Sequence, residues 1–129
     1  MSSKTSIFLS GGFKSDWQSK VLDRYKHKFE FYNPRDHNIV EPHLYAAWDT
    51  HYVRKSDIIF AFMELSNPSG FGLMFEIGMA YALNKTIILV DERSEVDETF
   101  ARYFKIAHQP SANVFKTLDE AFLFLDTFI

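Results

Sequence analysis

A single glutamate inside an apolar segment is the residue of this sequence most suited to chemistry. The stretch LMFEIGMAYAL, residues 73–83, has the pattern of a buried helix, and Glu76 is its one ionisable group apart from Tyr81. A carboxylate left unpaired there would cost on the order of several kcal/mol. The start of a helix favours its anion and apolar walls raise its pKa, so Glu76 is a candidate functional residue. The alternative is that it only satisfies free amides at the helix start or pairs with a distant arginine.

Glycines and polar loop residues are expected near this glutamate. Gly70 and Gly72 precede Glu76, and Gly11 ends the first apolar run of the chain, SIFLS. Glycine leaves room for another molecule to approach the backbone, so these three are candidate substrate-binding residues. In an open α/β sheet, ligands bind outside the carboxyl ends of the strands. The loop NPRDHNIVEPH, residues 33–43, should lie at the same rim of the sheet.

The elements that must position these residues alternate along the chain. Short apolar runs predict strands at residues 6–10, 29–32, 57–63, 86–90 and 113–115. Helical spacing of apolar residues predicts helices near residues 16–29, 42–55, 72–84, around 100, and from about 117. In the second helix the apolar stripe is Leu44, Ala47, Trp48 and Tyr52, and we expect it to pack in the core, as we expect of Tyr81. This alternation predicts an α/β fold with a parallel sheet of about five strands, covered by helices on both faces.

Length, charge and composition indicate which classes of protein the chain can belong to. A chain of 129 residues suits one domain, residues 1–129, and 47% hydrophobic content supports a buried core. The net charge of −3 gives no reason to expect nucleic-acid binding. The absence of cysteine excludes disulfides, thiolate metal sites and a cysteine nucleophile, and it fits a reducing compartment. No apolar run reaches the ~18 residues of a membrane span, so we expect a soluble cytoplasmic protein.

Several familiar sites are missing from the sequence. It contains no GxGxxG, GxxxxGK[ST] or HExxH motif. His43 and His51 would share a helix face, but surface or capping roles are favoured over metal binding. Carboxylates beside glycines and aromatic residues, without a metal or a cationic cluster, suit a reaction at a sugar carbon, where one carboxylate attacks and a second acid manages the leaving group.

The segment from Ser56 to Val90, SDIIFAFMELSNPSGFGLMFEIGMAYALNKTIILV, resembles the core motif of the nucleoside 2-deoxyribosyltransferase family, which also includes nucleoside 5′-monophosphate N-glycoside hydrolases. The resemblance extends over roughly residues 6–92. It implies a flavodoxin-like (Rossmann-like) three-layer sandwich that cleaves the bond between a nucleobase and C1′ of the sugar. It also implies substrates that are nucleosides or nucleotides and free nucleobases, and no metal or organic cofactor.

The resemblance assigns roles to single residues. Glu76 occupies the place of the nucleophile that forms a covalent glycosyl-enzyme, and Asp49 that of the second acid, which contacts or protonates the base. Phe8 and Phe13 match the aromatic residues that line the pocket. The remaining matches are Asp36 and Asn38, which fall where members of the family contact the base or hold the loop.

One loop departs from the transferase pattern. Many transferases place an aspartate six residues before the nucleophile, where this chain has Gly70. The hydrolases tend to have Pro-Ser in this loop, and Pro68 and Ser69 resemble that, with one more residue before Glu76. The Ser69 hydroxyl would bind either a 5′-phosphate or the 5′-hydroxyl of the sugar.

The resemblance favours a nucleoside 2′-deoxyribosyltransferase that works by double displacement through a glycosyl ester of Glu76. Two alternatives stay open. One is a nucleoside 5′-monophosphate N-glycosidase, and the other is a non-catalytic nucleotide-binding domain on the same fold. Family habit and the apolar C-terminal residues Phe124 and Phe128 predict a homodimer or larger homo-oligomer, to which Asn113 is a candidate contributor of a pocket residue.

Overall fold

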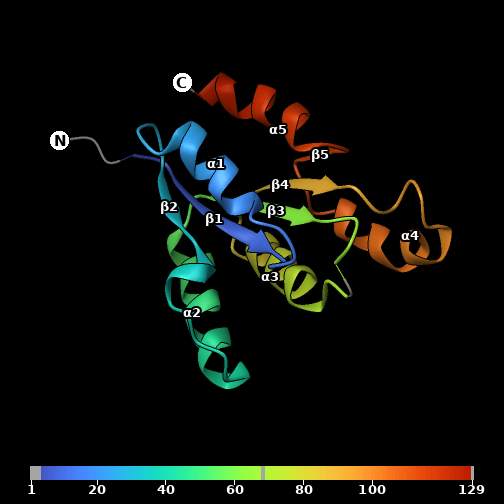
Figure 1. The fold of residues 1–129 in the computed structure, drawn as a ribbon, viewed down its shortest axis with the longest axis horizontal. Coiled ribbons are helices and arrows are strands. Elements are labelled where there is room, and N and C mark those ends of the chain that lie inside the picture. Colours follow the sequence, from blue (N-terminus) through green and yellow to red (C-terminus); the bar gives the residue numbers. More distant parts are fainter. Residues whose placement is uncertain (1–3, 68, 129) are drawn as a thin grey trace.

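A parallel sheet forms the centre of the molecule (Figure 1). The computed structural model describes residues 4–67 and 69–128, so the predicted role of Pro68 falls outside the described residues. The strands described are β1 (Ser6–Gly11), β2 (Glu30–Tyr32), β3 (Ile58–Met63), β4 (Thr86–Asp91) and β5 (Asn113–Phe115). They pair in parallel in the order β2-β1-β3-β4-β5. This is the strand order of flavodoxin-like folds, and it confirms the predicted sheet.

Helices cover both faces of the sheet, which confirms the three-layer sandwich. The helices are α1 (Trp17–Tyr25), α2 (Pro42–Lys55), α3 (Phe71–Ala82), α4 (Glu98–Phe104) and α5 (Leu118–Leu125), with 3-10 turns at Pro34–Asp36, Lys105–His108 and Asp126–Phe128. Figure 1 shows α1 and α5 on one side of the sheet and α2 and α3 on the other. Within the described ranges, no helix combines the length and the apolar character needed to cross a membrane.

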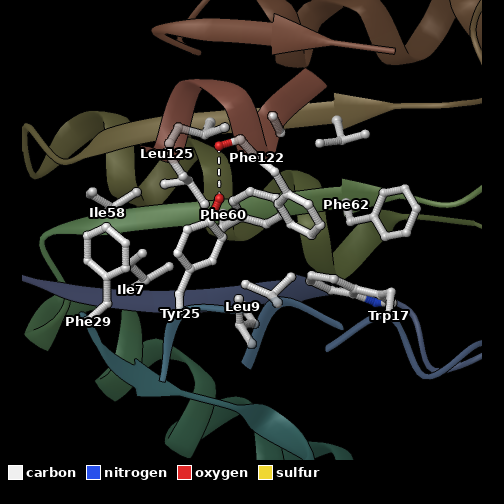
Figure 2. Close-up of a cluster of buried hydrophobic side chains, with 14 residues drawn as sticks. Ile7, Leu9, Trp17, Tyr25, Phe29, Ile58, Phe60, Phe62, Phe122 and Leu125 are labelled. Carbon is white, nitrogen blue, oxygen red and sulfur yellow. Dashed lines mark hydrogen bonds between the residues drawn. The ribbon is translucent and has the colours of Figure 1, made fainter. Parts of the chain in front are cut away.

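Strand periodicity divides the apolar residues between the two faces. Successive side chains of a strand point to opposite faces. On β3, Phe60 therefore joins Trp17 and Tyr25 of α1 in the first core cluster, together with Leu125 of α5 (Figure 2). The Trp17 ring stacks on Phe60 with their centroids 6.1 Å apart. Because both faces are covered, β3 is buried along its whole length.

The second core cluster lies on the other face and is less completely covered. It joins Ile59 and Met63 of β3 to Leu73 and Ile77 of α3, and to Val53 of α2. A single helix layer covers this face, so the far sides of α2 and α3 are open to solvent.

This open layer corrects two predictions about the core. Trp48 in the expected core stripe of α2 is 46% exposed. On α3, which was expected to be buried on every side, Phe71, Phe75 and Tyr81 are 79%, 61% and 64% exposed. The apolar pattern of α3 is real, but nothing in the described part of the chain packs against its outer side.

Gly70 explains why α3 begins where it does. Its φ of +85° lies in the left-handed region, which favours glycine. A Cβ added there would lie 2.1 Å from the Met63 Cε atom. Any other residue here would strain the left-handed backbone and would have to displace the tip of the Met63 side chain, so Gly70 favours the entry into the helix that carries Glu76.

Candidate active site

A pocket of about 410 Å³ opens where β1 and β3 end, between α2 and the start of α3. Its volume lies within the ~300–1,000 Å³ of small-molecule sites. The chain leaves β1 for β2 on one side of the sheet and leaves β3 for β4 on the other, so the adjacent ends of β1 and β3 form the switch point where open α/β sheets bind ligands. The described residues that line it are Gly11, Phe13, His37, Ile39, Val40, Tyr45, Asp49, Gly72, Leu73 and Glu76.

Glu76 projects into this pocket from the second turn of α3. Its Oε1 atom lies 2.5 Å from the hydroxyl oxygen of Ser10 on β1. The pKa of Glu76 is raised to about 8: burial raises it, the hydrogen bond from Ser10 lowers it, and the nearby Asp49 carboxylate raises it. The carboxyl is thus poised to exchange a proton near neutral pH.

Asp49 enters the same pocket from α2 and is held by His37. The His37 Nε2 atom lies 3.0 Å from Asp49 Oδ1, and the Ile39 backbone N–H donates to His37 Nδ1 at 3.1 Å. A backbone N–H can only donate, so Nδ1 must be the unprotonated nitrogen. His37 is therefore the neutral tautomer whose Nε2–H donates to Asp49. Burial raises the pKa of Asp49, and the hydrogen bond from His37 opposes that rise.

Five of the predicted site residues line the pocket: Gly11, Phe13, Asp49, Gly72 and Glu76. A Cβ at Gly72 would meet no atom within 4 Å among the described residues, so this glycine borders open space. A Cβ at Gly11 would lie 2.6 Å from the Phe62 carbonyl oxygen, so glycine is needed there for the close packing of β1 against β3.

Five predicted residues lie outside the pocket lining, and three of them are Phe8, Asp36 and Asn38. Phe8 has no exposed surface and belongs to the second core cluster, so the prediction that it lines the pocket is wrong. The alternation of β1 points it toward the helix layer, where Tyr52 packs on it with ring centroids 5.9 Å apart. Asp36 and Asn38 are exposed, and their loop reaches the pocket through His37, Ile39 and Val40 instead.

The loop before α3 also differs from expectation. Ser69 lines a separate pocket of about 370 Å³, beside Arg93 and Phe100. Gly70 is buried at the start of α3 and caps the helix, with no place in the lining of the pocket that holds Glu76. Ser69 before α3 and Gly72 in its first turn therefore line different cavities.

Two important residues were missed by the sequence analysis. Ser10 appeared only as a strand residue, and His37 only as part of the loop 33–43 expected at the rim of the sheet. Strand alternation held a signal for Ser10, because the residue after Leu9 must face the side of the sheet that carries α3. The contact of His37 depends on the conformation of residues 37–40, for which the sequence pattern held no signal.

The pocket has neither a cation nor a metal site among the described residues. Its lining contains no lysine or arginine. Across residues 4–67 and 69–128, no group of three histidine, cysteine, aspartate or glutamate side chains is arranged to hold a metal ion. Its chemical groups are thus two carboxyls of different environment, set among apolar walls.

Comparison with known proteins connects this arrangement to a family. The family described as "Nucleoside 2-deoxyribosyltransferase like" matches residues 4–94, more than half of the chain. No curated protein sequence matches the chain. A 2-deoxyribosyltransferase from Leishmania mexicana is similar in structure, with a TM-score of 0.70 and 20% identity over 93% of this chain and 95% of that one. The CMP N-glycosidase BcmB from Clostridium botulinum has a TM-score of 0.63 and 21% identity over 97% of this chain and 100% of its own. The two structures support the fold, and the family match shows that this chain belongs to the nucleoside 2-deoxyribosyltransferase-like family.

Proposed function

We propose that the protein is a nucleoside 2′-deoxyribosyltransferase, which exchanges the base of a 2′-deoxynucleoside through a covalent glycosyl ester of Glu76. The observation that carries the proposal is the presence of Glu76 and Asp49 in one pocket at the switch point of the sheet. Family membership supports it, as do the names of the two similar structures, a 2-deoxyribosyltransferase and a CMP N-glycosidase.

The first half-reaction forms the ester. A Glu76 carboxylate oxygen attacks C1′, the bond between C1′ and the base nitrogen breaks, and its electron pair stays on the base. Asp49 supplies the proton that the departing base takes up. Two carboxyls in one apolar pocket resist ionising together, so the pair holds one proton at neutral pH. In the empty pocket this proton resides mainly on Glu76. In the reactive state it must reside on Asp49, so that Glu76 is ionised.

The second half-reaction reverses these steps with a different base. The nitrogen of the incoming base attacks C1′, its proton passes to Asp49, and the Glu76 carboxylate is released. Two displacements at one carbon give net retention and ping-pong kinetics. If water takes the place of the second base, the same residues give a hydrolase.

The pocket lining favours nucleosides over nucleotides, because its described residues offer no cation for a 5′-phosphate. One observation favours the alternative, a nucleoside 5′-monophosphate N-glycosidase. The Arg35 guanidinium lies 4.6 Å over the ring of the pocket residue Phe13, where it hydrogen-bonds Gln18 and the Ser15 carbonyl. Released from these partners, it would supply the missing cation.

Base exchange tests the proposal. Thymidine or deoxyinosine is incubated with excess adenine, beside the corresponding 5′-monophosphates, and products are separated by chromatography. We expect deoxyadenosine from the wild type and none from Glu76→Gln. Glu64→Gln is the matched control, since Glu64 is also buried but lies outside the pocket lining. Free base released only from monophosphates would select the hydrolase, and no reaction with any substrate would overturn both in favour of a non-catalytic nucleotide-binding domain.

We also propose that the chain forms a homodimer or larger homo-oligomer through the outer sides of α2 and α3. Trp48 and Phe75 are large exposed apolar residues next in sequence to the pocket residues Asp49 and Glu76. The helices α2 and α3 contact each other, and large exposed apolar residues on neighbouring helices are expected at an interaction site. Sedimentation of the wild type and of Phe75→Ala tests this, and a monomeric wild type at micromolar concentration would contradict it.

A further inference from the structure

Ser10 is a group beside the pocket whose role the proposed function leaves unassigned. It lies near the end of β1 and has no exposed surface. Its hydroxyl lies 2.5 Å from Glu76 Oε1, and in the described part of the chain this is the one hydrogen bond of either side chain. The bond joins a central strand of the sheet to the helix that carries the carboxyl, so both ends are held by regular structure.

We propose that Ser10 is a positioning residue, which holds Oε1 of Glu76 by a hydrogen bond from strand β1 and leaves Oε2 as the oxygen that attacks the sugar. The inference rests on the proposed function. Ser10 transfers no proton and makes no covalent bond in this scheme. Its hydroxyl selects one of two otherwise equivalent oxygens and fixes the rotation of the carboxyl about its last bond.

The same hydrogen bond serves each state of the reaction. A hydroxyl donates more strongly to a carboxylate than to a neutral group, so Ser10 stabilises the Glu76 anion against the effect of burial. After attack, the sugar is on Oε2 and Oε1 becomes the carbonyl oxygen of the ester, which still accepts from Ser10. When the ester breaks, charge returns to the carboxylate and the bond strengthens again. The Ser10 hydroxyl on β1 therefore stabilises the carboxylate that leaves when the ester breaks.

The alternative is that Ser10 is only a satisfied polar group in the core. Ser6 at the other end of β1 shows what that role looks like: its hydroxyl lies 3.2 Å from Asp57 Oδ2 and 3.4 Å from the Lys55 carbonyl oxygen. Those contacts join the amino ends of β1 and β3, away from the pocket. A purely structural Ser10 would affect stability as Ser6 does and would leave the titration of Glu76 unchanged.

The experiment compares Ser10→Ala, Ser10→Thr and the control Ser6→Ala. Thermal unfolding first establishes that each variant is folded. Two quantities are then measured from pH 5 to 10: kcat/KM for base exchange, and the titration of the Glu76 carboxyl by ¹³C NMR in the free protein. The NMR arm does not depend on the reaction, so a failed transferase assignment and a failed role for Ser10 give different results.

Ser10→Ala should raise the pKa of Glu76 and lower kcat/KM about tenfold to a hundredfold near pH 7, the range for a lost hydrogen bond to a charged group. The difference in kcat/KM between Ser10→Ala and the wild type should shrink above pH 8. A higher pKa of Glu76 moves the high-pH limb of the pH profile of kcat/KM to higher pH in the variant. Ser10→Thr keeps the hydroxyl and should restore most of the rate, and Ser6→Ala should behave as wild type. An unmoved Glu76 titration in Ser10→Ala, or equal loss in the alanine and threonine variants, would overturn the proposal.

Discussion

The two faces of the sheet are built from the same strands but differ in how completely they are closed. On the face of α1 and α5, aromatic rings fill the space, and the Tyr25 hydroxyl lies 2.8 Å from the Phe122 carbonyl oxygen (Figure 2). On the face of α2 and α3, a pocket remains, and the partly buried Glu76 lines it with Ser10 as its hydrogen-bond partner. Adjacent residues of β1 contribute to each: Leu9 packs in the closed face, and Ser10 contacts the carboxyl on the other.

This difference separates stability from chemistry. The closed face supplies apolar burial, which is the dominant favourable contribution to folding. The open face retains a carboxyl whose ionisation in its pocket is unfavourable, a cost expected where a residue is kept for activity. Substitutions on the closed face should therefore mainly lower stability, and substitutions at the pocket on the open face should mainly lower the rate.

The largest expected effect comes from Glu76→Gln, which should remove the nucleophile and lower base exchange at least about a thousandfold. The same variant should be more stable than the wild type at pH 8. Burial raises the pKa of Glu76 from its ordinary 4.5 to about 8, so between these values the folded chain keeps a proton that the unfolded chain has lost. Stability of the wild type therefore falls as pH rises through this window. Because glutamine does not ionise, the stability of the Glu76→Gln variant should not fall with pH in this way.

The measurement is urea unfolding of both proteins at pH 5 and pH 8. The difference in the free energy of unfolding should grow with pH and favour the variant by on the order of a few kcal/mol at pH 8. Glu64→Gln provides the control for the chemical change itself. If Glu76→Gln were less stable than the wild type at pH 8, ionised Glu76 would not lower the free energy of unfolding, and the prediction would be wrong.

The second prediction contrasts one apolar residue from each face. Leu125→Ala removes a fully buried side chain from the closed face and should lower the free energy of unfolding by about 2–5 kcal/mol. Phe75→Ala removes a larger side chain that is mostly exposed on α3, and it should change the stability of the isolated chain by less than about 0.5 kcal/mol. Its effect should appear in self-association. Comparable losses of stability in both variants at low protein concentration would contradict the contrast.

How much the sequence could predict also differs between the faces. The apolar run of β3 and the helical spacing of apolar residues on α5 predicted the closed face, because both partners of each contact belong to this chain. Apolar character predicted burial of Phe75 and Tyr81 on α3. That prediction was wrong, since an apolar pattern indicates only that a side chain avoids water. The sequence of a helix does not show whether another part of the same chain packs against its apolar side chains.

The candidate site was predictable where regular elements decide it. Strand ends and helix register bring Asp49 and Glu76 to one rim, and the sequence motif identified both. The contact of His37 with Asp49 depends on the φ and ψ angles of a loop, including a left-handed Asn38 at φ +51°, which residue type favours without requiring. Burial of Phe8 was missed because alternation gives the face of a residue and not the position of the pocket on that face.

His37 should have a smaller effect than Glu76, because it acts through Asp49. His37→Phe keeps a ring of similar size and removes the donor to Asp49, so the pKa of Asp49 should rise. That rise alone would favour the protonated Asp49 that the reaction needs. The rate should nevertheless fall about tenfold, near the lower end of the range for one hydrogen bond to a charged group, because Asp49 loses the contact that orients it. In the wild type, ¹⁵N NMR should show a proton on Nε2 and none on Nδ1. A proton on Nδ1 would contradict the assigned tautomer and with it the direction of the hydrogen bond.

The smallest effect is expected on the closed face from Tyr25→Phe. The hydroxyl lies 2.8 Å from both the Phe122 carbonyl oxygen and Asp126 Oδ1, and it accepts from Arg24 Nε at 3.0 Å. Because it has one proton, it donates to one of the two acceptors at a time, and its loss should cost about 0.5–1.5 kcal/mol. Urea unfolding measures this cost, and base exchange measured in parallel should be unchanged, since Tyr25 lies across the sheet from Glu76. A tenfold fall in rate at unchanged stability would show that the closed face takes part in the chemistry, because only a coupling through the sheet would transmit the loss of a hydroxyl to the pocket.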